Sequence, residues 1–171
     1  MLNHIWAPWR GEYVAGWHKD AAGENTQSCV FCAKFAENRD ADNLILYRGR
    51  STAIIMNLYP YNNGHIMLLP IRHVADFELL TVDEAAELAA CKNFAILALK
   101  KALYPDGFNV GMNLGAAAGA GIAEHLHEHI VPRWNGDTNF MPVLNGAKII
   151  SEHIHKTYDK IKTCLKKEIS V

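Results

Sequence analysis

Three histidines alternate with other residues in one short segment, and they carry the strongest chemical signal in the chain. They are His125, His127 and His129, within Glu124-His-Leu-His-Glu-His-Ile-Val-Pro-Arg-Trp134. Alternate side chains of a β-strand point to the same face, so a strand here would place the three imidazoles in one row. Imidazole acts as a nucleophile, an acid or base, or a metal ligand near neutral pH. Three in strict alternation indicate chemistry rather than packing.

Two kinds of chemistry fit this row. A pair of histidines two residues apart on a strand can bind one metal ion. Alternatively, the middle histidine attacks a substrate while its neighbours fix its tautomer and stabilise charge. The turn before the row favours the second interpretation, because Gly115, Gly119 and Gly121 let backbone N–H groups approach an anion closely. The combination points to phosphate chemistry.

A second motif is the pair Cys29 and Cys32, whose Cys-x-x-Cys spacing lets two thiolates reach one Zn²⁺. The pair is only half of a site, and His73 and His125 are the candidates for the other half. Two alternatives remain, a reduced pair without metal and a redox pair. The redox pair is disfavoured because no thioredoxin-like βαβ pattern surrounds it.

The histidine segment resembles the signature of the histidine triad (HIT) superfamily of nucleotide hydrolases and transferases. The resemblance covers roughly residues 28–134, and its flanks look like the branch of diadenosine tetraphosphate phosphorylases and related hydrolases. The matching segments, in the family's order, are Trp6-Ala-Pro-Trp-Arg10, Asn57-Leu-Tyr-Pro-Tyr-Asn-Asn-Gly-His65, Pro70-Ile-Arg-His73, Gly111-Met-Asn113, His125-Leu-His-Glu-His-Ile-Val131 and Pro132-Arg-Trp-Asn-Gly-Asp-Thr-Asn-Phe140.

The resemblance implies roles for individual residues. His127 would attack the α-phosphorus and form a nucleotidyl-histidine, and His129 would bond the phosphate and the bridging oxygen. Asn113 would contact the α-phosphate, and Asn57 the ribose hydroxyls. Relatives with a Cys-x-x-Cys pair bind one structural zinc, which here would be held by Cys29, Cys32, His73 and His125. That zinc would fix His125 and thereby brace the neighbouring nucleophile.

The sequence departs from the family pattern at two places. Glu128 stands where the family has an apolar residue, and we expect it to belong to a local edge or an interface. Gly121 and Ile122 replace side chains that contact phosphate in many relatives, so backbone N–H groups near Ala120 and Gly121 would take over. This turn and Trp134 would frame the site of the second substrate.

The elements that must position these residues follow from the apolar pattern. Strands are expected over 44–48, 52–57, 64–70, 107–114 and 125–131. A capping box at Thr81 and Glu84 begins a helix that runs to about residue 103, and Pro105 with Gly107 stops it. A last helix runs from about Ser151. The sum is an α+β fold, a HIT-like antiparallel strand meander with one long inserted helix and a C-terminal helix.

The 171 residues suit a single domain, with a Trp-rich N-terminal arm at 1–20, a core at 28–134 and an extension with a helix at 135–171. A formal charge of −1 argues against a broad nucleic-acid surface. No apolar run approaches the roughly 20 residues of a membrane helix. The chain begins without a signal-peptide pattern, so a cytoplasmic location is expected. The family also implies a homodimer.

The leading hypothesis is therefore a HIT enzyme that cleaves a dinucleoside polyphosphate, first of all diadenosine tetraphosphate, through a nucleotidyl-His127 intermediate. It would use structural zinc and no organic cofactor. One alternative is a nucleoside phosphoramidate hydrolase, and another is a non-catalytic nucleotide-binding or zinc-stabilised interaction protein. A third is a zinc hydrolase in which His125, His127 and His129 are all ligands.

Overall fold

The computed structural model of the protein describes residues 29–138 and 150–169. Five strands form one antiparallel sheet in the order β1-β2-β3-β5-β4. Their bounds are β1 Ile45–Arg48, β2 Thr52–Met56, β3 Ile66–Pro70, β4 Gly107–Met112 and β5 Glu128–Arg133. The expected α+β fold is confirmed. The order differs from a simple meander in one respect, because β5 lies between β3 and β4.

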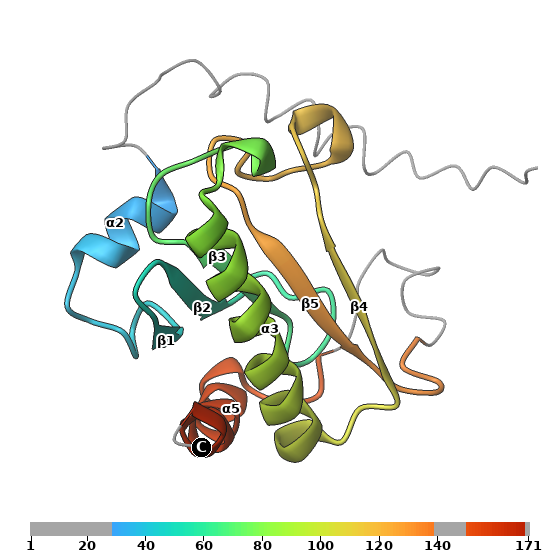
Figure 1. Cartoon of the computed structure of the whole chain (residues 1–171). Coiled ribbons are helices and arrows are strands. Elements are labelled where there is room, and N and C mark those ends of the chain that lie inside the picture. Colours follow the sequence, from blue (N-terminus) through green and yellow to red (C-terminus); the bar gives the residue numbers. More distant parts are fainter. Residues whose placement is uncertain (1–28, 139–149, 170–171) are drawn as a thin grey trace, which may run out of the picture.

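Within the described residues, three α-helices accompany the sheet: α2 Val30–Ala36, α3 Val82–Leu103 and α5 Ile154–Ile169. Helix α3 crosses one face of the sheet, contacts β2 and β3, and packs against α5, which also contacts β1 (Figure 1). Two short 3-10 turns complete the described chain, η1 Phe77–Leu79 and η2 Ala116–Ala118. The Trp-rich arm lies outside the described residues. None of the described helices combines the length and apolar character needed to span a membrane.

Local sequence signals explain the ends of the long helix. The Thr81 side chain accepts a hydrogen bond from the Glu84 N–H, and the Glu84 carboxylate accepts one from the Thr81 N–H, so the expected capping box is confirmed. At the other end Tyr104 adopts a left-handed conformation, one residue before Pro105. Proline cannot continue the helical hydrogen bonds, so the chain turns into β4.

The core fills the space between the sheet and the two long helices. All residues of β2 and β3 are buried. Helix α5 is attached to the edge strand by the Tyr158 hydroxyl, which donates to the Ile45 carbonyl at 3.0 Å. The largest fully buried apolar side chains include Ile54, Ile66, Leu68, Leu99, Ile130 and Leu165. This core packs against β5, the strand that begins within the histidine row, and holds it in place.

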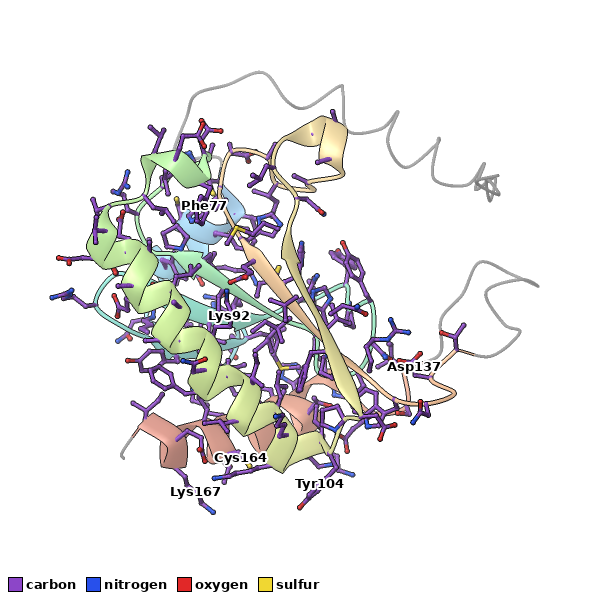
Figure 2. All side chains as sticks on the ribbon, turned by 45° about the vertical axis from the view of Figure 1, so that its right-hand side comes forward. Phe77, Lys92, Tyr104, Asp137, Cys164 and Lys167 are labelled. Atoms are coloured by element: carbon purple, nitrogen blue, oxygen red, sulfur yellow. The ribbon has the colours of Figure 1, made fainter. Side chains whose placement is uncertain are left out.

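Glu128 does not occupy an edge or an interface, so that expectation was wrong. Strand β5 is an inner strand, and Glu128 is 5% exposed. Its Oε1 lies 2.7 Å from the Nζ of Lys92 on helix α3. A partly exposed lysine in the helix thus neutralises the buried carboxylate (Lys92 is labelled in Figure 2). The pair also shows that Glu128 points toward α3, so its neighbour His129 faces the opposite side of the sheet.

Candidate active site and metal site

The three histidines of the row lie together, but only the last belongs to a strand. Strand β5 begins at Glu128, so the strand expected over 125–131 starts three residues late. The preceding segment is held by other bonds, because the Leu126 N–H donates to the Val74 carbonyl at 2.7 Å. His127 and His129 nevertheless stay adjacent, with ring centroids 4.9 Å apart. The row is continuous in space although it is not a regular strand.

His127 is held in one tautomer by the backbone. Its Nδ1 lies 2.8 Å from the carbonyl oxygen of His125. A carbonyl can only accept, so Nδ1 carries the proton and Nε2 keeps its lone pair in the neutral ring. Burial lowers the pKa of His127 below its ordinary value, while the bond to the His125 carbonyl opposes that shift. The result is a neutral imidazole with an unprotonated Nε2, which is the form that attacks an electrophile.

His129 makes a polar contact with a fourth histidine, His65. Its Nδ1 is 2.9 Å from Nε2 of His65, a residue just before β3 that is fully buried. Burial, together with the neighbouring His127, lowers the pKa of His129 to about 4. The ring of Tyr61 lies beside both imidazoles, with centroids 4.6 Å from His65 and 5.6 Å from His129. His65 ends the segment 57–65 that resembles the family, but no role was predicted for it.

The two cysteines and two histidines expected to bind metal come together. Ligand atoms of Cys29, Cys32, His73 and His125 all lie within 4.8 Å of one another. The Cys29 sulfur is 3.3 Å from Nδ1 of His125, and the Cys32 sulfur is 3.3 Å from Nδ1 of His73. Cys29 and His125 are fully buried. Among the described residues this is the one cluster of its kind, and its donor set suits a tetrahedral zinc.

The protonation of His125 also fits a metal ligand. Its Nε2 lies 2.8 Å from the carbonyl oxygen of Pro70, so Nε2 is the donor and Nδ1 keeps its lone pair toward the cysteines. A ligand histidine commonly donates its other N–H to a carbonyl in this way. Burial and the adjacent Cys29 thiol raise the pKa of Cys32 to about 11. Zinc would therefore displace a proton on binding.

Helix α2 connects this cluster to His127. It begins directly after Cys29 and was not predicted, because its seven residues make about two turns, too few to establish a helical period, and Cys29 makes no side-chain cap. Its buried residue Phe31 lies against two histidines of the row. The ring centroids are 5.4 Å apart for His125 and 5.5 Å for His127. One helix thus places both a metal ligand and the packing surface of His127.

Of the expected substrate contacts, Asn57 and Asn113 are held by bonds beside the site. The Asn57 side chain accepts from the Tyr59 N–H at 2.9 Å, and its amide nitrogen lies 3.4 Å from Nδ1 of His65. The Asn113 amide donates to the carbonyl of Gly119 at 3.3 Å. Asn113 therefore ties the end of β4 to the glycine-rich turn.

The glycine-rich turn is more ordered than an open loop. It contains the 3-10 turn η2, and Gly115 and Gly119 have positive φ angles. The N–H of Ala120 donates to the Gly115 carbonyl at 3.3 Å. Of the two amides expected to face an anion, that of Ala120 is thus already engaged inside the turn. Gly121 is exposed and remains the candidate.

The structure does not bring Trp134 to the histidines within this chain. It follows the far end of β5, five residues after His129, which corresponds to roughly 17 Å along a strand. Its indole N–H donates to the carbonyl of Tyr104, the cap of α3, at 3.1 Å. A hollow of about 720 Å³ beside it is lined by Asn62, Asn63 and residues at the end of α3, after β5, and before and within α5, and none of the three histidines lines it.

The buried neutral histidines predict a loss of stability in mild acid. Burial and the neighbouring His129 and His127 lower the pKa of His65 to about 3, and that of His129 is about 4. Between about pH 6.5 and pH 4 the unfolded chain therefore binds protons that the folded chain does not. We expect the free energy of unfolding to fall as pH decreases, by about 1.4 kcal/mol per pH unit for each such histidine.

Denaturant unfolding at a series of pH values between 7 and 4.5 measures this slope. His65→Gln should make the slope shallower by about one proton, at equal metal concentration. The control is His155→Gln, since that side chain is exposed. Equal slopes for the wild type and His65→Gln would contradict the prediction.

Comparison with known proteins gives consistent matches. Residues 38–136 match the family model of the HIT domain. A protein named AP-4-A phosphorylase from Mycobacterium tuberculosis is 41% identical over 160 residues, which cover 92% of this chain and 81% of the relative. A Zn-bound histidine triad family protein from Mycobacterium smegmatis superimposes with a TM-score of 0.69 at 26% identity, over 85% of this chain and 99% of that one. A hypothetical histidine triad nucleotide-binding protein from Sulfolobus tokodaii superimposes with a TM-score of 0.64 at 30% identity, over 83% of this chain and 92% of that one.

Proposed function

Because this chain belongs to the HIT domain family, we propose that it is an enzyme that cleaves dinucleoside polyphosphates, with diadenosine tetraphosphate as the first candidate substrate. The observation that carries the proposal is the bond from His127 Nδ1 to the His125 carbonyl, which leaves Nε2 as a nucleophile. The relative named AP-4-A phosphorylase supports the choice of substrate.

In the first step, Nε2 of His127 attacks the α-phosphorus, and the bond from that phosphorus to the bridging oxygen breaks. The departing nucleotide takes the electron pair, and a nucleotidyl-histidine forms. The proton on Nδ1 stays in place, where the His125 carbonyl stabilises the positive charge of the substituted ring. His129 donates a hydrogen bond to the bridging oxygen as negative charge develops on it.

In the second step, water or inorganic phosphate attacks the same phosphorus from the side that the leaving group vacated. The bond to Nε2 breaks and its electron pair returns to the ring, the attacking water or phosphate releases its proton to solvent, and His127 returns to its neutral Nδ1–H form. Two displacements give retention of configuration at phosphorus and ping-pong kinetics. With diadenosine tetraphosphate the first product is ATP, and the second is ADP with phosphate or AMP with water.

The other site residues bind and orient the nucleotide. Asn57 binds the ribose hydroxyls through its oxygen, which is aligned by the Tyr59 N–H. Asn113 contacts the α-phosphate from the end of β4, next to the turn that its amide braces. The backbone amide of Gly121 adds a donor for the phosphate oxygens. We place the second substrate near this turn, and a role for Trp134 requires that it act in another protomer's site.

We further propose that Cys29, Cys32, His73 and His125 hold one structural zinc ion. Four protein ligands close the coordination sphere, so the ion stabilises the fold and does not meet substrate. The proximity of the four ligand atoms supports this proposal, as does the unprotonated Nδ1 of His125. The ion would fix His125, whose carbonyl in turn positions His127.

A homodimer is proposed through strand β4. In the described part of the chain, β4 ends the sheet and pairs only with β5. Val110 on this strand is 43% exposed, and an uncovered edge strand invites pairing. The cytoplasmic location stays a prediction.

The test is a single turnover of diadenosine tetraphosphate by the full chain, with and without inorganic phosphate. ADP and ATP formed only with phosphate would establish a phosphorylase, the outcome we expect from the similarity to the M. tuberculosis protein. AMP and ATP without phosphate would establish a hydrolase. No cleavage in either buffer would overturn the proposed substrate and favour a phosphoramidate or simple nucleotide binding.

A further inference from the structure

His65 is a buried titratable residue to which the proposed mechanism gives no part. It lies between Gly64, which has a φ of +72°, and the first residue of β3. Its side chain is 0% exposed. Backbone bonds hold it on both sides, because its N–H donates to the Asn62 carbonyl at 3.2 Å and its carbonyl accepts from the Asn57 N–H at 3.0 Å. The backbone of His65 is therefore held in place on both sides of the residue.

The direction of the hydrogen bonds around His65 is determined by the backbone. The N–H of Tyr61 donates to Nδ1 of His65 at 3.1 Å. A backbone N–H can only donate, so Nδ1 carries a lone pair and the proton of the neutral ring lies on Nε2. That Nε2 is 2.9 Å from Nδ1 of His129. His65 is thus the donor, and Nδ1 of His129 is the acceptor.

The same reasoning continues to the second ring. Since Nδ1 of His129 accepts a hydrogen bond, the proton of neutral His129 lies on Nε2. Both rings are neutral near pH 7, because burial and the neighbouring histidines lower the pKa of His65 to about 3 and that of His129 to about 4. The chain of bonds runs in one direction, from the Tyr61 amide through His65 to His129.

We propose that His65 is a positioning residue that fixes His129 as the Nε2–H tautomer, so that His129 offers a donor to the substrate. The opposite tautomer would direct a lone pair at a negatively charged oxygen. The statement about the tautomer rests on the geometry alone, and its effect on turnover rests on the proposed function.

A link to the ribose site follows from the same contacts. The amide nitrogen of Asn57 lies 3.4 Å from the Nδ1 that the Tyr61 N–H also approaches. The Asn57 oxygen accepts from the Tyr59 N–H, which orients the amide with its nitrogen toward His65. Asn57, which we propose binds the ribose, therefore contacts His65, the residue that orients the His129 hydrogen-bond donor toward the phosphate.

Two amide substitutions separate the two bonds of His65. In His65→Gln, the longer side chain can place an N–H near the position of Nε2 and still donate to His129. In His65→Asn, the shorter side chain can accept from the Tyr61 N–H but does not reach His129. The variants differ by one methylene group, so the pair is a matched control for the loss of the imidazole itself.

The primary measurement is the ¹⁵N NMR spectrum of the imidazoles in the full chain, assigned by comparison with His129→Asn. We expect the wild type and His65→Gln to show His129 protonated at Nε2 and unprotonated at Nδ1. In His65→Asn the fraction of this tautomer should fall, and kcat/KM should fall about 100-fold, as after removal of one donor to a transition state. His65→Gln should keep kcat/KM within about tenfold of the wild type.

Protonation of His129 at Nδ1 in the wild type would overturn the proposal, as would equal tautomer populations and rates in the two variants. The wild-type spectrum alone decides the assignment if His65→Asn does not fold. Because the spectrum does not depend on turnover, a protein that cleaves no dinucleotide but shows the expected tautomer would refute the proposed function and leave this inference intact.

Discussion

His127→Ala is expected to lower the rate of dinucleotide cleavage by about 10⁴-fold or more, without loss of the fold. The substitution removes the proposed nucleophile, and neither of the two other histidines of the row can replace it. Nδ1 of His129 is occupied by the bond to His65, and His125 turns its Nδ1 toward the cysteines. Losses of this size follow removal of a catalytic nucleophile. Single-turnover kinetics with diadenosine tetraphosphate measure the effect.

Nucleotide binding distinguishes loss of chemistry from loss of the site. Calorimetry with AMP should give an affinity for His127→Ala within about tenfold of the wild type, because Asn57 and Asn113 remain. His155→Ala is the control, since that histidine is exposed on the C-terminal helix. Labelled nucleotide should remain attached to the wild type after an alkaline quench and be released by acid, as a phosphoramidate is. Turnover by His127→Ala within tenfold of the wild type would refute the nucleotidyl-His127 intermediate.

The second large effect is expected from the metal ligands. Cys29→Ser should abolish binding of one zinc per chain and destabilise the protein by about 4 kcal/mol or more, as loss of a structural metal does. Cys29 is fully buried, and its sulfur lies 3.3 Å from Nδ1 of His125. The substitution would leave three ligands facing a site without its ion. Metal analysis and thermal unfolding of the purified chain measure both effects.

Cys164→Ser provides the matched control. This cysteine is only partly buried, on helix α5, and does not belong to the cluster. It should keep the zinc and unfold close to the wild type. A chelator should lower the unfolding temperature first, with activity lost as the protein unfolds. Immediate loss of activity in a still folded protein would contradict a structural role and favour a zinc hydrolase.

Local patterns in the sequence predicted most of the fold. The capping box at Thr81 and the Pro105 after the helix depend on neighbouring residues, so the ends of α3 could be placed closely. The start of β5 could not be placed in this way. Alternation of residue types indicates which side chains would share a face, but it does not show which backbone groups pair with a neighbouring strand. His125 lies outside the strand ladder, and its Nε2 bonds to the carbonyl oxygen of Pro70, 55 residues earlier.

The site was predicted to a similar degree. The histidine row and the Cys-x-x-Cys spacing are visible in the sequence, and the structure brings the four expected metal ligands together. His65 is different, because its significance lies in a contact with His129, 64 residues away, and in a proton whose position is set by the Tyr61 amide. Glu128 was misplaced for the same reason, as its partner Lys92 belongs to another element.

The Cys–His cluster also determines when, during synthesis, the metal site can be completed. Cys29 and Cys32 leave the ribosome early, but His125 follows Cys29 by 96 residues. β1 to β4 and the long helix α3 must all be synthesised before the fourth ligand exists. Closing so large a loop costs entropy that sheet formation has to offset first. The proposed zinc would therefore join a nearly complete fold and slow its unfolding, rather than act as the nucleus from which folding starts.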